Sequence, residues 1–258
     1  MNCAPMIENA IETTEDAFLG GQLRIRQPKS GHRAGHDAML LAAAVAAREG
    51  DRVVEFGAGV GVAGLAVAKR CAGIRIVLVE IDPALAQLAR GNAAANGIKA
   101  KVIAMDVVST GRDFAAAGLV PDSVDVVLMN PPFNDPKRHR SSPNKQLAHV
   151  ALPTTLERWI AAARRILKSG GVVTLIWRAD GLAEALAALE RGFGDLVIQP
   201  VHGDATAPAI RVLIRATKGS NAPPRIYAGV MLSDDAGLPN KAIKNILAGK
   251  GALPLATA

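Results

Sequence analysis

The sequence contains little cysteine, few aromatic residues and no long apolar run. Its two cysteines, Cys3 and Cys71, are too few for a disulfide framework and belong to no CxxC pair, so we expect a reducing, cytoplasmic location. The longest uninterrupted apolar stretch, residues 38–47, falls well short of the roughly 20 residues that span a bilayer. No Lys or Arg occurs among the first twenty residues, which is unlike a secretory signal. We therefore expect neither a membrane-spanning protein nor a membrane partner.

Half of the 258 residues are hydrophobic but only 3% are aromatic. This composition predicts an aliphatic core large enough for one domain and excludes a disordered chain. The 30 Lys and Arg exceed the 23 Asp and Glu, which gives a formal charge of +7. The excess lies in three basic segments, residues 24–33, 137–145 and 211–225. Such clusters suit a polyanion such as RNA or DNA, although a solvated, solubilising surface explains them equally well.

Short β-branched runs alternate with longer alanine-rich runs from residue 51 onward. The expected strands are residues 52–56, 74–80, 100–104, 124–129 and 172–177, and the expected helices are residues 62–70, 83–95, 154–167 and 181–191. This alternation predicts a parallel sheet with helices on both faces. Two further strand-like runs, residues 196–201 and 209–217, leave no room for a helix between them and predict a closing antiparallel hairpin.

We expect three segments along the chain. Residues 1–50 form a hairpin (residues 17–28) and a helix (residues 37–48) that pack on the core. Residues 51–218 form the sheet domain, and residues 219–258 extend it.

A glycine loop, Glu55-Phe56-Gly57-Ala58-Gly59-Val60-Gly61, follows the first expected strand. Glycines are needed there because side chains would block the turn and keep a ligand off the backbone. Glu80 ends the next strand, where a carboxylate accepts hydrogen bonds from ribose hydroxyls. We therefore expect an adenosine-type cofactor, and the residues assigned to it are Gly57, Ala58, Gly59, Gly61, Glu80 and Ile81.

The identity of this cofactor depends on nearby acids. Gly59-x-Gly61-x-x-Gly64 also matches the dinucleotide fingerprint, which is weak by itself. A pyrophosphate favours a helix N-terminus without a nearby carboxylate, whereas Glu55 precedes the loop and suits the cationic part of S-adenosylmethionine. Asp106, followed by Val107, comes just beyond the third strand and is placed to accept from an adenine amino group. The alternative is that Glu55 and Asp106 only cap helices or turns.

The tetrad Asn130-Pro131-Pro132-Phe133 directly follows the fourth strand and precedes a polar, basic segment, residues 134–150, that predicts a long loop. Pro131 biases Asn130 towards extended backbone. The Asn130 side-chain oxygen and the Pro131 carbonyl can then accept both hydrogens of one planar amino group, and Phe133 offers a ring for stacking. Held in this way, the nitrogen attacks a methyl carbon through positioning and desolvation. We assign the whole tetrad as catalytic and Asn130 also to the cofactor site; an ordinary Pro-Pro turn is the alternative.

Together these segments, over roughly residues 50–180, resemble class I S-adenosylmethionine-dependent methyltransferases that act on amino groups. The resemblance implies a Rossmann-like sheet of seven strands, mostly parallel with one antiparallel strand. Residues 31–42 (GHRAGHDAMLLA) and 211–219 (RVLIRATKG) are similar to segments of bacterial tRNA (adenine-N6) methyltransferases of the valine-tRNA type. This resemblance implies adenine N6 in tRNA or other RNA as the target. It also places Asp37, which we expect as a helix N-cap, near the cofactor.

Three rival functions remain open. Release-factor glutamine methyltransferases carry a similar Asn-Pro-Pro-aromatic tetrad, because a glutamine side chain is also a planar amide. A nicotinamide-dependent dehydrogenase leaves the tetrad unexplained, and so does a non-catalytic RNA-binding relative. His32 and His36 have no third ligand at a fitting spacing, so we expect no metal site.

Overall fold

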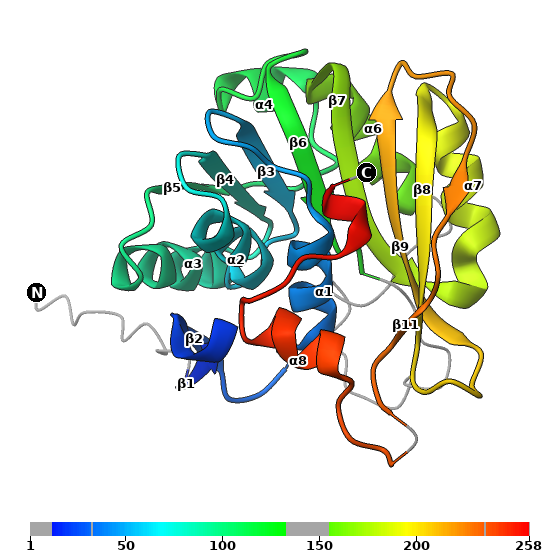
Figure 1. Cartoon of the computed structure of the whole chain (residues 1–258). Coiled ribbons are helices and arrows are strands. Elements are labelled where there is room, and N and C mark those ends of the chain that lie inside the picture. Colours follow the sequence, from blue (N-terminus) through cyan, green and yellow to red (C-terminus); the bar gives the residue numbers. More distant parts are fainter. Residues whose placement is uncertain (1–11, 32, 133–154, 235, 258) are drawn as a thin grey trace, which may run out of the picture.

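The computed structural model describes residues 12–31, 33–132, 155–234 and 236–257. Its centre is a mixed sheet that runs the width of the molecule (Figure 1). In spatial order the strands are β10 (Arg225–Ile226), β8 (Phe193–His202), β9 (Ala209–Lys218), β7 (Leu167–Arg178), β6 (Val124–Met129), β3 (Arg52–Phe56), β4 (Arg75–Glu80) and β5 (Ala100–Ala104), and β11 (Val230–Met231) also pairs with β8. All neighbours are parallel except β9, which is antiparallel to both β7 and β8. The expected seven-stranded sheet with one antiparallel strand is confirmed, and the two-residue strands β10 and β11 add to its edge.

Helices cover both faces of this sheet (Figure 1). On one face lie α1 (His36–Ala44), α2 (Val62–Arg70), α3 (Pro83–Ala95) and α8 (Lys241–Leu247); on the other lie α4 (Gly111–Ala116), α6 (Thr155–Ile166) and α7 (Leu182–Glu190). Successive strand residues point to opposite faces, so Val53 joins the first core and Val54 the second. The two cores are largely aliphatic, as expected, and Trp159 and Trp177 are buried in the second.

The N-terminal hairpin consists of β1 (Thr13–Phe18) and β2 (Leu23–Pro28), joined by the 3-10 turn η1 (Leu19–Gly21). It begins earlier than the expected residue 17. Acids on and beside β1 form ion pairs with the basic segment 24–33: the pairs are Arg24–Glu15, Lys29–Glu12 and Arg33–Asp16. Residues 24–33 contain no acid themselves, but β1 and the residue before it supply three.

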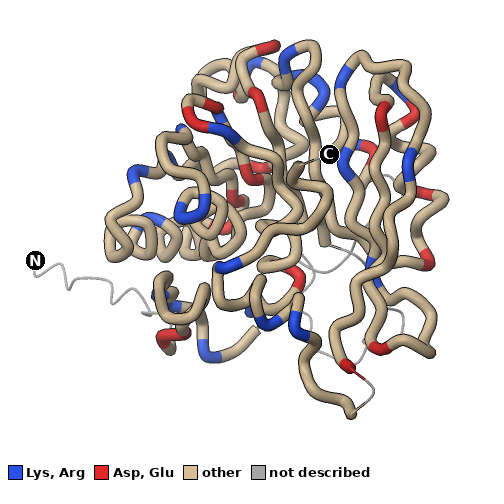
Figure 2. The backbone as a smooth tube through the Cα atoms, viewed as in Figure 1, with Lys and Arg blue, Asp and Glu red and all other residues tan. Residues whose placement is uncertain are grey.

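The basic segment 211–225 is also paired with acids from elsewhere in the chain. Its ion pairs are Arg211–Asp37, Arg215–Asp195, Lys218–Asp122 and Arg225–Asp195. Acidic and basic positions are accordingly interleaved along the trace (Figure 2). Neither described basic segment is therefore an uncompensated patch. The third, residues 137–145, lies outside the described residues.

Several boundaries differ from the expectation. The helix expected over residues 37–48 ends at Ala44, because Val45 adopts extended backbone. The sequence analysis missed α4, whose start is a capping box between Thr110 and Asp113, and it also missed α8 and the 3-10 turns η4 (Ala179–Gly181) and η5 (Pro254–Ala256). The division of the chain at residues 50 and 218 stays a prediction. Every helix in the described ranges is too short or too polar to cross a bilayer.

Candidate functional site

The polar residues expected at the site meet at one edge of the sheet. Phe56, the last residue of β3, pairs with Val79 of β4 and with Met129 of β6. The residues that follow, Gly57, Glu80 and Asn130, therefore stand at the same level on three neighbouring strands. Carboxyl ends of parallel strands are where open α/β sheets bind ligands. The register of the ladder thus brings the glycine loop, Glu80 and Asn130 together at one edge of the sheet.

The glycine loop has the backbone shape that its sequence requires. Gly57 and Gly59 adopt φ of 65° and 54°, in the left-handed region that glycine tolerates. A Cβ on Gly57 would lie 2.5 Å from the Trp159 ring of α6, whereas a Cβ on Gly59 would meet nothing within 4 Å. Gly57 is thus needed for packing against Trp159, and Gly59 leaves space in which a ligand can approach the backbone.

Glu80 holds the loop from the neighbouring strand. Its carboxylate accepts hydrogen bonds from the Gly59 N–H at 2.6 Å and the Asp82 N–H at 2.9 Å. A carboxylate has about four acceptor positions, so both oxygens retain lone pairs for ribose hydroxyls. Beside it, Ile81 is 52% exposed, which is unusual for an isoleucine at the end of a core strand and suits a surface on which a flat base packs.

Asp106 closes the far side of the edge, two residues beyond β5. Its side chain accepts from the Val108 N–H at 2.9 Å and its carbonyl accepts from the Ser109 N–H. Val107 between them is buried. The Asp106 side chain therefore shapes a turn in this structure, which is the alternative role considered above. One carboxylate oxygen has no part in that turn.

Glu55 differs from its expected role. It lies on the face of β3 that α2 covers, is 5% exposed, and accepts a 2.7 Å hydrogen bond from the Gly64 N–H. The pKa of Glu55 is raised from 4.5 to about 8: burial is the main cause, the Gly64 hydrogen bond opposes the rise, and the neighbouring Glu80 adds to it. A neutral Glu55 at pH 7 supplies no negative charge to a cation. It fixes the first turn of α2 instead.

Asn130 carries the most informative single atom of the site. Its Oδ1 is buried and accepts no hydrogen bond from any described residue. Buried acceptors are almost always satisfied, and each exception needs an explanation. Pro131 beside it is buried and half-buried Pro132 follows, whereas Phe133 and residues 134–150 lie outside the described residues. The open acceptor is the atom that the sequence assigned to a substrate amino group.

Asp37 is not the N-cap of α1. Gly35 holds that position, and Asp37 lies in the first turn, where its carboxylate accepts from the Arg211 Nε at 3.0 Å. The N-cap prediction was therefore wrong, because the helix starts one residue earlier than expected. Its role towards the cofactor stays a prediction.

Two asparagines that the sequence analysis overlooked fasten the loop and the hairpin together. Asn92 of α3 accepts from the Arg26 N–H at 2.8 Å and donates to the Arg26 carbonyl at 3.1 Å and to the Val60 carbonyl at 3.0 Å. Asn96, one helical turn later, accepts from the Arg24 N–H and donates to the Arg24 carbonyl. The pair continues the edge of β2 as a neighbouring strand would. A polar residue between buried Ala89 and Ala93 was the available signal.

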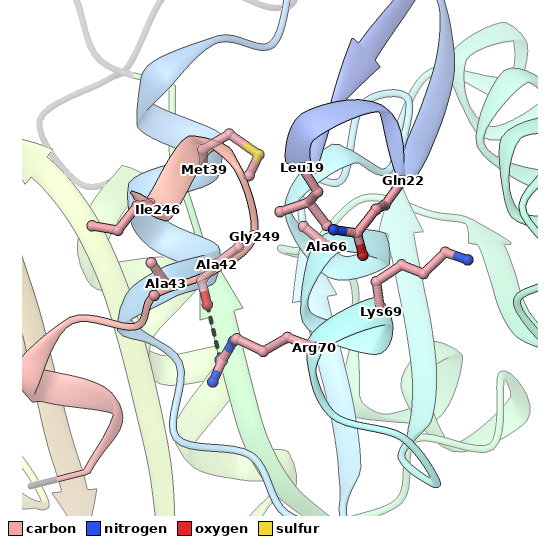
Figure 3. A pocket seen from close by; sticks show the side chains of 11 residues that line it. Leu19, Gln22, Met39, Ala42, Ala43, Ala66, Lys69, Arg70, Ile246 and Gly249 are labelled. Atoms are coloured by element: carbon pink, nitrogen blue, oxygen red, sulfur yellow. Dashed lines mark hydrogen bonds between the residues drawn. The ribbon is translucent and has the colours of Figure 1, made fainter. Parts of the chain in front are cut away.

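A small cavity lies away from these residues, between α1, α2, α8 and η1 (Figure 3). Its volume is about 40 Å³, and apolar side chains such as Leu19, Met39 and Ile246 line it. Arg70 points to its lower rim, where its Nη2 donates to the Ala42 carbonyl at 3.0 Å (Figure 3). This cavity is too small for a nucleoside and contains none of the expected site residues.

Comparisons with known proteins agree with the geometry. The family model "Methyltransferase small domain" matches residues 30–199. A tRNA1(Val) (adenine(37)-N6)-methyltransferase of Porphyromonas gingivalis is 29% identical, with 66% of this chain and 68% of that protein covered. A release factor glutamine methyltransferase of Chlorobaculum tepidum is 26% identical over 62% and 56%. A crystal structure of a "predicted O-methyltransferase" from Agrobacterium tumefaciens superposes with a TM-score of 0.70, at 31% identity over 84% and 98% of the two chains.

The raised pKa of Glu55 predicts an unusual pH dependence of stability. Between pH 4.5 and 8 the folded protein holds a proton on Glu55 that the unfolded chain lacks, so the free energy of unfolding falls as pH rises through this window. The loss over this window is on the order of 5 kcal/mol. Glu55→Gln stays neutral and keeps an oxygen for Gly64, so it should be more stable than wild type at pH 9. Urea unfolding at pH 5.5 and 9 measures the free energy of unfolding of both proteins. The control is Asp113→Asn, which removes an exposed acid whose pKa is lowered. If the free energy of unfolding of Glu55→Gln falls with pH as steeply as that of wild type, the argument is contradicted.

The hydrogen bonds by which Asn92 and Asn96 hold β2 and the glycine loop form an asparagine clamp. We expect the two asparagines to contribute unequally to the free energy of unfolding. Asn92→Ala strands the buried Val60 carbonyl, which costs about 1–3 kcal/mol, and also removes the part-buried hydrogen bonds to the Arg26 N–H and carbonyl. Asn96→Ala strands groups that water can reach, so we expect a loss of about 1 kcal/mol or less. Urea unfolding with hydrogen exchange at Val60 and Arg26 measures both effects. Equal losses in the two variants, or unchanged exchange at Val60 in Asn92→Ala, show that the clamp does not hold the loop.

Proposed function

The chain belongs to the methyltransferase small domain family, and from this premise we propose that it transfers a methyl group from S-adenosylmethionine to an exocyclic amino group, adenine N6 in tRNA or another RNA. The observation that carries the proposal is the Oδ1 of Asn130, which is buried at the level of Gly57 and Glu80 and has no partner among the described residues. An acceptor held there without a partner is one half of a cradle for an NH2 group, and the Pro131 carbonyl is the other half. A cytoplasmic location, expected from the cysteine content, suits this substrate.

The chain's own residues suit this cofactor. The open face of Gly59, the carboxylate of Glu80 and the exposed Ile81 provide backbone approach, ribose acceptors and an apolar surface for adenine. Asp106 and Val107 would close the adenine edge, and Asp37 would approach from α1. When bound, the cofactor supplies an electrophilic methyl group on a sulfonium. Asn130 and Pro131 would orient the amino group and draw its hydrogens into hydrogen bonds, so that the nitrogen lone pair points out of the base plane.

The same contacts disfavour a dinucleotide. A pyrophosphate would use the free N–H groups at the start of α2, but the Gly64 N–H already donates to Glu55. A hydroxyl substrate, as the Agrobacterium tumefaciens protein's description suggests for that relative, needs a group that removes its proton. An amide oxygen and a peptide carbonyl are poor bases, whereas they suit a neutral amino group.

RNA is favoured over a protein amide by the relatives and by charge. The Porphyromonas gingivalis relative, named for a tRNA adenine, is covered over 68% of its length, and the release factor enzyme over 56%. The basic segments 24–33 and 211–225 are neutralised by acids, so their part in RNA binding is smaller than the sequence suggested. Lys137, Arg138, Arg140 and Lys145 follow the tetrad in sequence, and we propose that they contact the substrate.

The proposal predicts a selective defect in Asn130→Ala. Removing the acceptor should lower the methyl transfer rate at least about 100-fold, as the loss of one positioned hydrogen-bond partner does elsewhere. The Kd of S-adenosylmethionine should change by less than about threefold, because the remaining cofactor contacts are intact. Radiolabelled methyl transfer to total RNA and calorimetric cofactor binding measure the two quantities.

Asn96→Ala is the matched control, since it removes an asparagine of the same fold outside the site. Wild-type turnover in Asn130→Ala removes the tetrad from the mechanism. Label that enters total protein instead of total RNA favours the glutamine-methylating alternative. Tight binding of NAD without S-adenosylmethionine binding overturns the cofactor assignment.

A further inference from the structure

A groove between α6 and the segment after β5 collects arginines that the proposed reaction does not use. Arg158, Arg164 and Arg165 line one side, and Val107, Val108 and Ser109 line the other. The groove encloses about 410 Å³ and is open to solvent on one side. Because Arg158 and Arg165 are seven residues apart on one helix, they spread positive charge over about 10 Å.

These three guanidinium groups have no acid partner among the described residues. In the described ranges no carboxylate lies within 4.0 Å of Arg158, Arg164 or Arg165, whereas seven basic side chains of the segments 24–33 and 211–225 are ion-paired. Their hydrogen bonds go to neutral oxygens: Arg164 donates to the Arg191 carbonyl at 2.6 Å and Arg165 to the Ser109 carbonyl at 3.3 Å. The charge of the groove is therefore uncompensated.

Arg165 is anchored although its charge is unpaired. Its guanidinium stacks 4.6 Å over the Phe114 ring, and its buried Nε donates to no described residue. The Phe114 ring and the Ser109 carbonyl thus hold the Arg165 guanidinium in place beside the groove.

One end of the groove, at Val107 and Arg158, adjoins the candidate site, and the Arg164–Arg165 end extends towards Arg191 and Asp122, which precede β8 and β6. Val107 follows Asp106, and Trp159, next to Arg158, contacts Gly57 of the glycine loop. A strand whose amino group reaches Asn130 would therefore carry neighbouring groups along this side of the molecule.

We propose that this arginine groove binds phosphate groups of the RNA whose amino group is methylated; the inference rests on the proposed function. Arginine suits this role because its planar fork donates two parallel hydrogen bonds to a phosphate. The contact is independent of sequence, so it orients the strand and leaves base recognition to the site. Binding through it weakens with salt, since each neutralised phosphate releases counterions.

The test compares two charge-matched double variants with unfractionated bacterial tRNA as the probe. Arg158→Gln with Arg164→Gln removes two exposed, unpaired charges and leaves the anchored Arg165 in place. Arg24→Gln with Arg225→Gln removes two exposed charges that are paired with acids. The groove variant should bind tRNA about tenfold more weakly, with the slope of log K against log salt reduced by about 0.7 to 0.9 for each lost contact.

Other readouts separate phosphate binding from a structural role. In the groove variant we expect the KM for tRNA to rise while kcat, the Kd of S-adenosylmethionine and the unfolding midpoint stay at wild-type values. The control variant should match wild type in all of these. If wild type methylates tRNA and the groove variant retains its Kd and salt slope, the groove is not a phosphate site and the proposed function stands. If wild type methylates protein and no RNA, both proposals fall together.

Discussion

The hydrogen-bonded register between three parallel strands is the constraint on which the site depends. β3 pairs with β4 on one side and β6 on the other, with Phe56 opposite both Val79 and Met129. A one-residue slip in either pairing would turn every side chain of the shifted strand to the other face. The aliphatic residues alternate between two separate cores, so such a slip would exchange the side chains that fill them and, in β3, would turn Glu55 into the second core. Core packing thereby fixes the relative positions of Glu80, the glycine loop and Asn130.

Within that frame, side chains from three elements hold one short loop. Glu80 accepts from Gly59, Glu55 accepts from Gly64, and Asn92 donates to Val60. Each of these side chains is at most 6% exposed, and buried hydrogen bonds of this kind are costly to break. The loop is consequently shaped before any ligand arrives, which reduces the ordering that binding requires. Next to this loop, the buried Oδ1 of Asn130 accepts no hydrogen bond from the described residues, which is why we propose it as the acceptor for a substrate amino group.

The sequence predicted the seven main strands of the sheet and helices α2, α3, α6 and α7 but not α4 or α8, because hydrophobic periodicity and glycine positions are local signals. It could not predict contacts between distant segments. Glu55 was expected to face the cofactor, but residue 55 points towards α2, on the same face of the sheet as Val53. The clamp by Asn92 depends on where β2 docks, 66 residues away in sequence. Asp37 lost its expected capping role through a one-residue shift of the helix start, and boundaries of that size are hard to fix from propensity.

Whether a basic run forms an electrostatic patch also depends on contacts between distant segments. A run of lysines and arginines indicates an electrostatic patch only if the fold brings no acids to it, and here β1 brings Glu12, Glu15 and Asp16 to the first run. The arginines of α6 were unremarkable in sequence, since Arg164 and Arg165 lie in the last turn, where cations favourably face the helix dipole. The dipole accounts for their sign, but it does not account for three arginines that line one groove with no carboxylate among its described lining residues. Long-range attraction of a polyanion depends on net uncompensated charge, so a basic run in a sequence indicates such charge only where the fold leaves it unpaired.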